Sequence, residues 1–351
     1  MEKLGLVLDG GGGKGAYQIG VWKYLKEVGL DNNIKAISGT SVGGLNACLF
    51  ALNDYGLAET LWTQKIQDKI LSLDVEKEDI KDIFNQIVNV LSIPHNTAIA
   101  IFNFLKTLVF KGVFSRKGLS DLIDEYIDLD AISKMYFPIY ATCTEFPTFK
   151  TQYFQLNGKD KETIKKILLS TSAIPIIFPM QEINNIQDNI YKEGKKSYWD
   201  GGIKDNSPIK PLLDIGCTDI IVIHFDGKEI LKYRKENVNI YEICPKEDLG
   251  NMITGVLDFS PEGAYRRIAQ GYNDAKEILQ VVVDIARAQA GIVKDLDIIR
   301  NHEKAFKQNR KQALEKRQKL KSNLNSTMES FMNIDENKKN YLEEQNKKNL
   351  E

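Results

Sequence analysis

Residues 37–44, Ile37-Ser38-Gly39-Thr40-Ser41-Val42-Gly43-Gly44, decide the fold of this chain. A short apolar run at 34–37 precedes this glycine-flanked serine, and a helix-prone run at 45–52 follows it. The order strand, G-x-S-x-G, helix is typical of a nucleophile elbow, in which Gly39 and Gly43 leave room for a sharp turn. Ser41 is therefore predicted to project at the N-terminus of a helix, where the helix dipole favours developing negative charge.

The neighbouring stretches predict a parallel sheet. Leu4 to Leu8 is a short apolar strand pattern, and a helix pattern follows at 16–25 with Gly29 as its C-terminal cap. Strand, helix, strand, helix within fifty residues is typical of parallel strands joined by right-handed crossovers. Further strands are expected at 138–143, 152–156 and 220–224, and a long helix at 260–285. We therefore expect an α/β fold in three α/β/α layers, with a mainly parallel central sheet.

The composition of the 351 residues excludes several classes of protein. A hydrophobic fraction of 42% supplies a large core, and a net charge of -1 gives no general attraction to nucleic acid. No signal-peptide pattern follows Met1, and no run approaches the roughly 20 apolar residues of a spanning helix. We therefore expect a cytoplasmic or peripheral membrane location. The widely spaced Cys48, Cys143, Cys217 and Cys244 are predicted to be reduced core thiols.

The glycine run Gly10-Gly11-Gly12-Gly13-Lys14-Gly15 lies between the first strand and the first helix. A dinucleotide-binding loop expects an acidic residue at the end of the second strand, which here ends in Gly39-Thr40-Ser41. A phosphate-binding Walker loop expects Ser or Thr after Lys14, where Gly15 stands. Successive backbone N–H groups at a helix N-terminus also suit the oxyanion of an acyl-transfer intermediate. This third use fits a nucleophile on the neighbouring strand.

A serine nucleophile needs a group that takes its proton, and histidine is the usual one. The chain has only three histidines: no motif surrounds His224, His95 lies in the expected insertion, and His302 lies in the polar tail. Asp200, in contrast, ends a strand pattern between Trp199 and two glycines. Either this carboxylate is an ordinary turn aspartate or it is held near the serine and partly shielded from water.

These stretches together resemble the patatin-like phospholipase family. The run at 10–15, Gly39-Thr40-Ser41-Val42-Gly43, and Asp200-Gly201-Gly202 are similar to the oxyanion loop, nucleophile elbow and D-G-A/G motif of that family. The flanking segments 170–179 and 206–208 also agree, and the order of the three motifs makes the resemblance specific. It covers residues 4–213 well, is weaker over 214–285, and is absent from the C-terminal tail.

The resemblance implies a dyad of Ser41 as nucleophile and Asp200 as general base, without histidine, metal or cofactor. The amides of Gly11, Gly12 and Gly13 would stabilise the oxyanion. Lys14 either fixes this loop or meets a phosphate. The pKa of Asp200 would have to be raised by desolvation beside Trp199, because an ordinary aspartate is a weak base.

The implied activity is acyl-ester hydrolysis of a phospholipid or another lipid ester. Two alternatives stay open: an acyltransferase or transacylase on the same dyad, and a catalytically silent lipid-binding module. The partners expected are lipid esters and a peripheral membrane surface, but not nucleic acid. The sequence leaves the oligomeric state open.

Three parts of the chain are distinguished by composition and by this resemblance. Residues 4–213 form the catalytic domain, with a helical insertion at 57–119 as a lid candidate, and 214–290 complete it. The charged extension at 291–351 is either a solvated helix or a partly disordered tail. Within the insertion, the apolar helix pattern 96–113 is either buried or faces lipid. In the lipid-facing case, Lys106, Lys111, Arg116 and Lys117 would lie near head groups.

Overall fold

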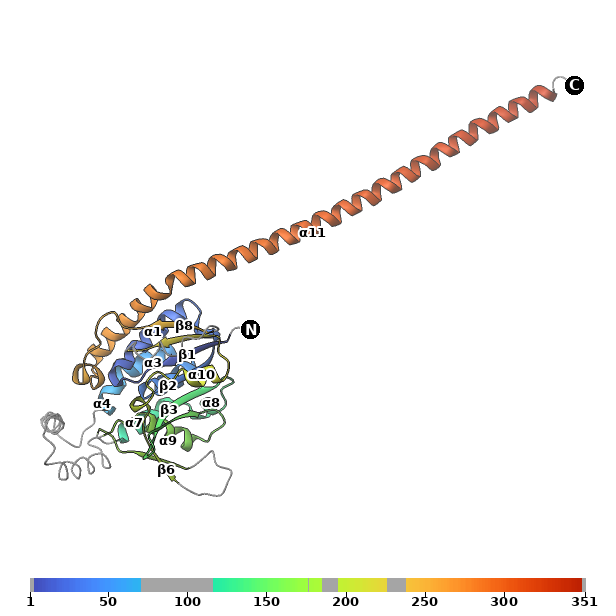
Figure 1. Cartoon of the computed structure of the whole chain (residues 1–351). Helices are drawn as coiled ribbons and strands as arrows, with labels where there is room; N and C mark the ends of the chain where they lie inside the picture. Colours follow the sequence, from blue (N-terminus) through green and yellow to red (C-terminus); the bar gives the residue numbers. More distant parts are fainter. Residues whose placement is uncertain (1–2, 71–115, 176, 185–194, 226–237, 349–351) are drawn as a thin grey trace, which may run out of the picture. The chain divides into compact units, whose positions relative to one another are not determined.

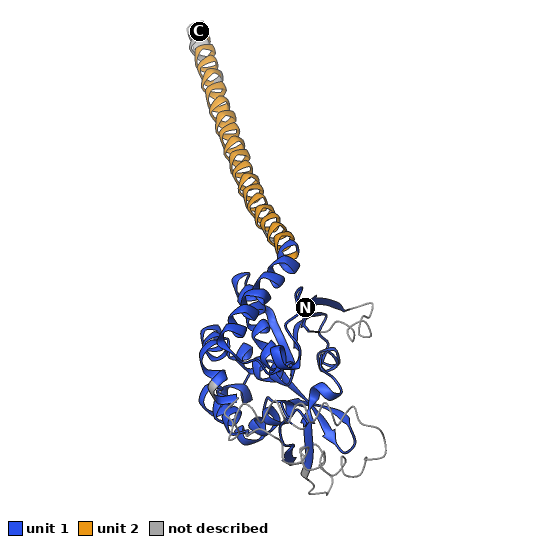
Figure 2. Cartoon of the chain, turned by 90° about the vertical axis from the view of Figure 1, so that its left-hand side faces the viewer, with its two compact units in different colours: residues 1–281 blue, residues 282–351 orange. Residues whose placement is uncertain are grey.

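The computed structural model describes residues 3–70, 116–175, 177–184, 195–225 and 238–348 (Figure 1). The chain divides into two compact units, residues 1–281 and residues 282–351 (Figure 2). Most of the expected insertion at 57–119, including the apolar pattern 96–113 and His95, lies outside the described residues.

A single sheet forms the centre of the first unit. Its strands in the described residues are β1 (Leu4–Leu8), β2 (Ile34–Thr40), β3 (Ile139–Phe146), β4 (Lys150–Gln155), β5 (Gln181–Asn184), β6 (Lys195–Asp200), β7 (Asp219–Ile223) and β8 (Asn239–Ile243). The order is β5-β6-β3-β2-β1-β7-β8, with β4 paired to β3. Strands β3, β2, β1, β7 and β8 are parallel, whereas β4, β5 and β6 are antiparallel to their neighbours. The expected mainly parallel sheet is therefore confirmed.

Helices cover both faces of this sheet. They are α1 (Ala16–Glu27), α2 (Val42–Leu52), α3 (Tyr55–Thr60), α4 (Ile66–Ile70), α7 (Lys117–Tyr126), α8 (Leu129–Ser133), α9 (Lys161–Thr171), α10 (Lys210–Asp214) and α11 (Pro261–Lys348). Short helical turns are η1 (Gly12–Gly15), η2 (Asp31–Asn33), η3 (Leu61–Lys65), η5 (Gly201–Ile203) and η7 (Met252–Val256). Helix α2 packs on β1, β2 and β3, whereas Leu212 of α10 packs with Val7 and Ala36 in a separate core cluster.

The central strand β1 shows that the sheet is covered on both faces. Its Leu6, Val7 and Leu8 are completely buried, although successive side chains of a strand point to opposite faces. Such a continuous apolar run is typical of a parallel strand covered by helices on both faces. The three-layer α/β/α fold is confirmed.

Gly29, the expected cap of the first helix, has φ +77, a left-handed conformation that glycine adopts without strain.

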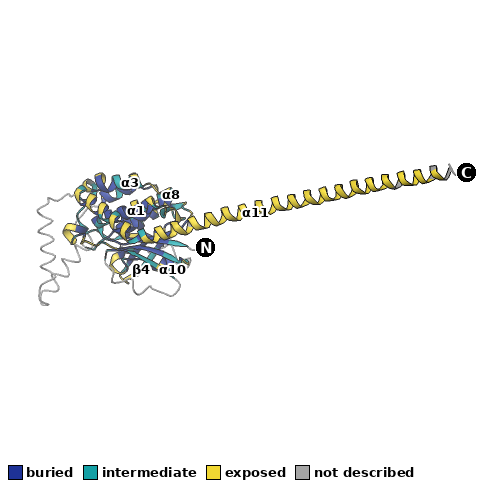
Figure 3. Ribbon diagram, turned by 90° about the horizontal axis from the view of Figure 1, so that it is seen from above, coloured by how far each residue is buried: buried dark blue, intermediate teal, exposed yellow. Residues whose placement is uncertain are grey.

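Helix α11 is much longer than the expected helix at 260–285. Its first turns bury Ala264, Ile268, Ala275 and Leu279 in the first unit. From Asp284 onward, every residue whose side chain is described is exposed (Figure 3). The expected C-terminal extension is therefore helical in the described residues. None of the described helices is both long enough and apolar enough to cross a membrane.

The four cysteines are free, as expected. Cys48, Cys143 and Cys217 are buried, but Cys244 is exposed, so the prediction of a core thiol is wrong there. Cys244 directly follows β8, which lies at the edge of the sheet.

Candidate active site

The turn between β2 and α2 holds Ser41 in a strained conformation. Ser41 has φ 55 and ψ -127, a region that residues with a side chain rarely adopt. A Cβ added to Gly39 would lie 2.2 Å from the Gly43 carbonyl oxygen, and one added to Gly43 would lie 2.2 Å from that of Leu8. Both glycines are therefore required by close backbone approach. This geometry is that of the expected elbow, with Ser41 directly before the first residue of α2.

Thr171, at the end of α9, anchors this turn from the side. The Ser41 backbone N–H donates to Thr171 Oγ1 at 2.9 Å, and the Thr171 hydroxyl donates to the Thr142 carbonyl at 2.5 Å. All three residues are at least 95% buried. Sequence reasoning included Thr171 in a segment similar to the family but gave it no role. The sequence carries no local signal for this contact, because α9 and the elbow meet only in the folded chain.

The glycine run forms a loop directly beside the elbow. A Cβ on Gly10 would lie 2.9 Å from Ser41 Cβ, so the run approaches the serine closely. Within the described part of the chain, the backbone N–H groups of Gly11, Gly12 and Gly13 donate no hydrogen bond. Gly12 has φ +54, which suits glycine. The loop therefore offers free donors near Ser41, as an anion site requires.

Buried Asp9, at the end of β1, holds the start of this loop. Its Oδ1 accepts a 2.5 Å hydrogen bond from Ser207, and its Oδ2 accepts from Asn206 Nδ2 and from the Phe225 backbone N–H, both at 3.3 Å. Asn206 also donates to the Gly10 carbonyl at 3.1 Å. Asp9 and Asn206 are thus positioning residues that sequence reasoning missed, since their roles depend on contacts between distant segments.

Asp200 ends strand β6, and the residue is 95% buried from solvent. Its backbone N–H donates to the Ala173 carbonyl at 2.9 Å, and its Oδ1 accepts from the Gly202 N–H at 2.7 Å. Its Oδ2 is buried and has no hydrogen-bond partner among the described residues. A Cβ on Gly201 would lie 2.3 Å from the Thr142 carbonyl oxygen, so this position requires glycine.

Burial raises the pKa of Asp200 to about 6. The Ser41 hydroxyl, the Gly202 N–H and the positive charge of Arg116 each favour the ionised form and oppose this rise in pKa. Ser41 and Asp200 are therefore close enough to interact, although no hydrogen bond of ordinary geometry joins these two described side chains. A carboxylate with a raised pKa and an open oxygen is suited to accept a proton.

Arg116 lies inside the protein rather than at a lipid-facing surface. Its side chain is buried, its Nη1 donates to the Leu169 carbonyl, and its guanidinium lies 5.2 Å from the centre of the Phe178 ring. The hypothesis that Arg116 meets a lipid head group therefore does not fit its position. Burial lowers the pKa of Arg116 to about 10, so it remains charged at neutral pH.

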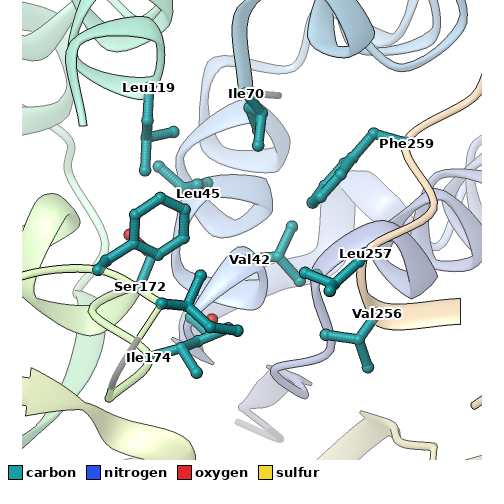
Figure 4. Close-up of a pocket in the computed structure, with 13 residues that line it drawn as sticks. Val42, Leu45, Ile70, Leu119, Ser172, Ile174, Val256, Leu257 and Phe259 are labelled. Atoms are coloured by element: carbon teal, nitrogen blue, oxygen red, sulfur yellow. The ribbon is translucent and has the colours of Figure 1, made fainter. Parts of the chain in front are cut away.

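An apolar cavity opens at Ser41. It measures about 560 Å³, including its mouth, and its walls include Val42, Leu45, Leu119, Ile174, Leu257 and Phe259 (Figure 4). A second cavity of about 460 Å³ shares Val42, Leu45, Ile70, Leu119 and Phe259 with the first. It extends along α2 to Leu49, Trp62 and Ile127. The two cavities together offer a site for a long apolar group next to the serine.

Lys14 and the two histidines in the described residues do not take part in the contacts between Ser41, Asp200 and the glycine amides described above. The Cε atom of Lys14 lies 2.8 Å from a Cβ built on Gly255, so the Lys14 stem packs against η7. His224, directly after β7, is buried with its Nε2 3.4 Å from Glu242 Oε2, and it does not line the cavity at Ser41. His302 is an exposed residue of the second unit.

The chain is similar to known proteins in sequence and in structure. A family profile described as patatin-like phospholipase matches residues 6–213. A stretch of 50 residues is 50% identical to lysophospholipase nte1 of Aspergillus terreus and covers 14% of this chain but 3% of that protein. The structure of VipD from Legionella pneumophila has 16% identity and a TM-score of 0.40, covering 80% of this chain and 67% of VipD. The structure of human GIVD cytosolic phospholipase A2 has 8% identity and a TM-score of 0.43, covering 82% of this chain and 60% of that protein.

Proposed function

The chain belongs to the patatin-like phospholipase family, whose profile matches more than half of its residues, and from this premise we propose that it hydrolyses lipid acyl esters. Ser41 is the nucleophile and Asp200 the general base of a two-residue mechanism. The acyl chain of the substrate occupies the apolar cavity at Ser41, and a phospholipid is the first substrate class to test.

The first half of the reaction forms an acyl-serine. The Ser41 hydroxyl gives its proton to Oδ2 of Asp200 as Ser41 Oγ attacks the ester carbonyl carbon. The carbonyl oxygen becomes an oxyanion and accepts hydrogen bonds from the free amides of the glycine run. The bond to the alcohol then breaks, and the leaving oxygen takes the proton from Asp200. The acyl group remains on Ser41.

The second half releases the acid. Asp200 takes a proton from a water molecule as the water oxygen attacks the acyl carbon, and the same amides hold the new oxyanion. The bond to Ser41 Oγ breaks, and Oγ regains a proton from Asp200. These steps use no metal ion, since the proton acceptor and the oxyanion donors are groups of this chain.

The observation that carries this proposal is the meeting of a strained serine with a buried carboxylate. Ser41 has positive φ, Asp200 Oδ2 has no partner among the described residues, and the Ser41 hydroxyl lowers the pKa of that carboxyl. A structural aspartate in such a place would be expected to have both oxygens hydrogen-bonded.

The test compares Ser41→Ala, Asp200→Asn and His224→Gln on a phospholipid and on a soluble p-nitrophenyl ester. We expect Ser41→Ala to abolish turnover and Asp200→Asn to reduce kcat by about 100- to 10,000-fold, the usual range for a general base. His224→Gln should stay active once folding is verified by circular dichroism. Activity retained in Ser41→Ala would refute the proposal, and loss of activity only in His224→Gln would indicate a histidine base.

A further inference from the structure

The glycine loop beside Ser41 is covered by a segment that lies outside the matched residues 6–213. A Cβ on Gly12 would lie 2.1 Å from the Val256 carbonyl oxygen, and one on Gly13 would lie 2.1 Å from that of Asp258. Backbone therefore lies directly on backbone, with no side chain between the loop and residues 255–258. The position of this segment sets the position of the loop amides.

A completely buried arginine, Arg267 on α11, fastens this segment. Its Nη2 donates to the Thr254 carbonyl and to Asp258 Oδ2, both at 2.7 Å. Its Nη1 donates to the Asp258 carbonyl at 2.9 Å and to the Gly13 carbonyl at 3.4 Å. One rigid guanidinium thus joins η7, the following turn and the glycine loop.

The chemistry of this contact points to positioning rather than to packing alone. Burying a charged guanidinium is costly, and apolar side chains of similar size often pack at least as stably. The planar fork of arginine, however, fixes several acceptors in one geometry, which a lysine ammonium does not do. Asp258, its ionic partner, is itself held by Ser260, whose Oγ donates to Asp258 Oδ1 at 2.6 Å.

We propose that Arg267 is a positioning residue for the oxyanion site. It holds residues 254–258 against Gly12 and Gly13, and so aims the free amides of the loop at the carbonyl oxygen of a substrate bound to Ser41. This inference rests on the proposed function. It adds that the oxyanion site is completed by a part of the chain that carries none of the three motifs.

The main test is Arg267→Lys, with Arg266→Lys as the matched control, because Arg266 is the exposed neighbour on the same helix. Lysine keeps the charge but loses the fork. We expect kcat on a p-nitrophenyl ester to fall by about 10- to 100-fold, as for a small misplacement of reacting groups, while KM changes by less than about twofold. The control should match the wild type in both constants.

Chemical rescue separates positioning from folding. Arg267→Ala leaves a space in which added guanidinium ion binds, and we expect it to restore kcat at least about tenfold, although Ser41→Ala gains nothing. Asp258→Asn keeps the backbone acceptors and should show a smaller fall in kcat than Arg267→Lys. Each variant is compared per folded molecule, with the folded fraction measured by circular dichroism.

Three outcomes would overturn the proposal. They are an unchanged kcat per folded molecule in Arg267→Lys, an equal loss in Arg266→Lys, and a loss confined to KM. If Arg267→Ala does not fold, Arg267→Lys and Asp258→Asn decide the question. The proposed function fails separately, because it is contradicted by turnover in Ser41→Ala or by a loss of activity only in His224→Gln, and not by any result with the Arg267 variants.

Discussion

Two buried aspartates in the candidate active site, Asp9 directly after β1 and Asp200 at the end of β6, differ in their hydrogen bonding. Both residues are at least 95% buried. The two oxygens of Asp9 accept hydrogen bonds from Ser207, Asn206 and Phe225. Asp200 accepts one at Oδ1, whereas its buried Oδ2 has no partner among the described residues.

This difference in hydrogen bonding distinguishes a carboxylate that stabilises a loop from one that has an oxygen able to accept a proton. The hydrogen bonds to Asp9 offset the desolvation of its carboxylate on burial. The same hydrogen bonds fix the start of the glycine loop. The carboxylate of Asp200 has fewer hydrogen-bond donors to offset the loss of solvation on burial. Its pKa therefore rises to about 6. Exposure alone does not distinguish the two residues, but the number of donors that face each carboxylate does.

The strongest test of this contrast replaces each aspartate with asparagine and measures the free energy of unfolding at pH 8. The raised pKa of Asp200 means that its ionised form is destabilising above pH 6, so Asp200→Asn should stabilise the protein by roughly 3 kcal/mol at most. Asp9→Asn should destabilise it by about 3 kcal/mol, because an amide group would face hydrogen-bond donors.

The pH dependence of this pair provides the control. The stability gain of Asp200→Asn should disappear as the pH falls through 6 toward 4, since wild-type Asp200 is then protonated in the folded state. The contrast would be wrong if Asp200→Asn were less stable than the wild type at pH 8.

Activity should depend on the same ionisation. If Asp200 is the base, kcat/KM rises about tenfold per pH unit below a midpoint near 6 and levels off above it. Arg116 favours the ionised form, so Arg116→Gln should move this midpoint to higher pH. Measurement of the pH–rate profile with a soluble ester decides this, and a midpoint that does not move would exclude an influence of Arg116.

Thr171 offers a smaller perturbation on the Ser41 side of the site. Thr171→Val keeps the shape of the side chain but leaves the buried Ser41 N–H without its acceptor. We expect a loss of about 1–3 kcal/mol in the free energy of unfolding, together with reduced kcat. Thr171→Ser, which keeps the hydroxyl, is the matched control and should recover most of both. Equal effects of valine and serine would show that the methyl group, rather than the hydroxyl, matters.

The smallest expected effect concerns the apolar surroundings of the site. If the second cavity takes the far end of the acyl chain, Leu49→Phe should shorten it. The ratio of kcat/KM for long-chain over short-chain p-nitrophenyl esters should fall about tenfold, and the value for the short ester should stay nearly constant. An unchanged ratio would place the acyl chain elsewhere.

Much of the fold was predictable because its signals are local. The apolar run of β1, the glycines of the elbow and the cap at Gly29 each specify a nearby backbone conformation. Strand β8 and the edge strand β5 were not predicted, since β8 is only partly buried and β5 has only four residues. The sequence also left open whether residues 291–351 form a helix or a partly disordered tail, because exposed side chains carry no regular apolar pattern.

The sequence by itself determined the elbow at Ser41, the glycine loop and the strand end at Asp200. Each of these turns is specified by neighbouring residues that include glycines, because only glycine permits the backbone geometry of the turn. Only the tertiary structure decided which side chains contact these three turns. Thr171, Asn206 and Arg267 reach the site from distant segments, and the open oxygen of Asp200 is defined by the donors that do not face it. Such relations depend on packing and burial, which no short stretch of sequence encodes.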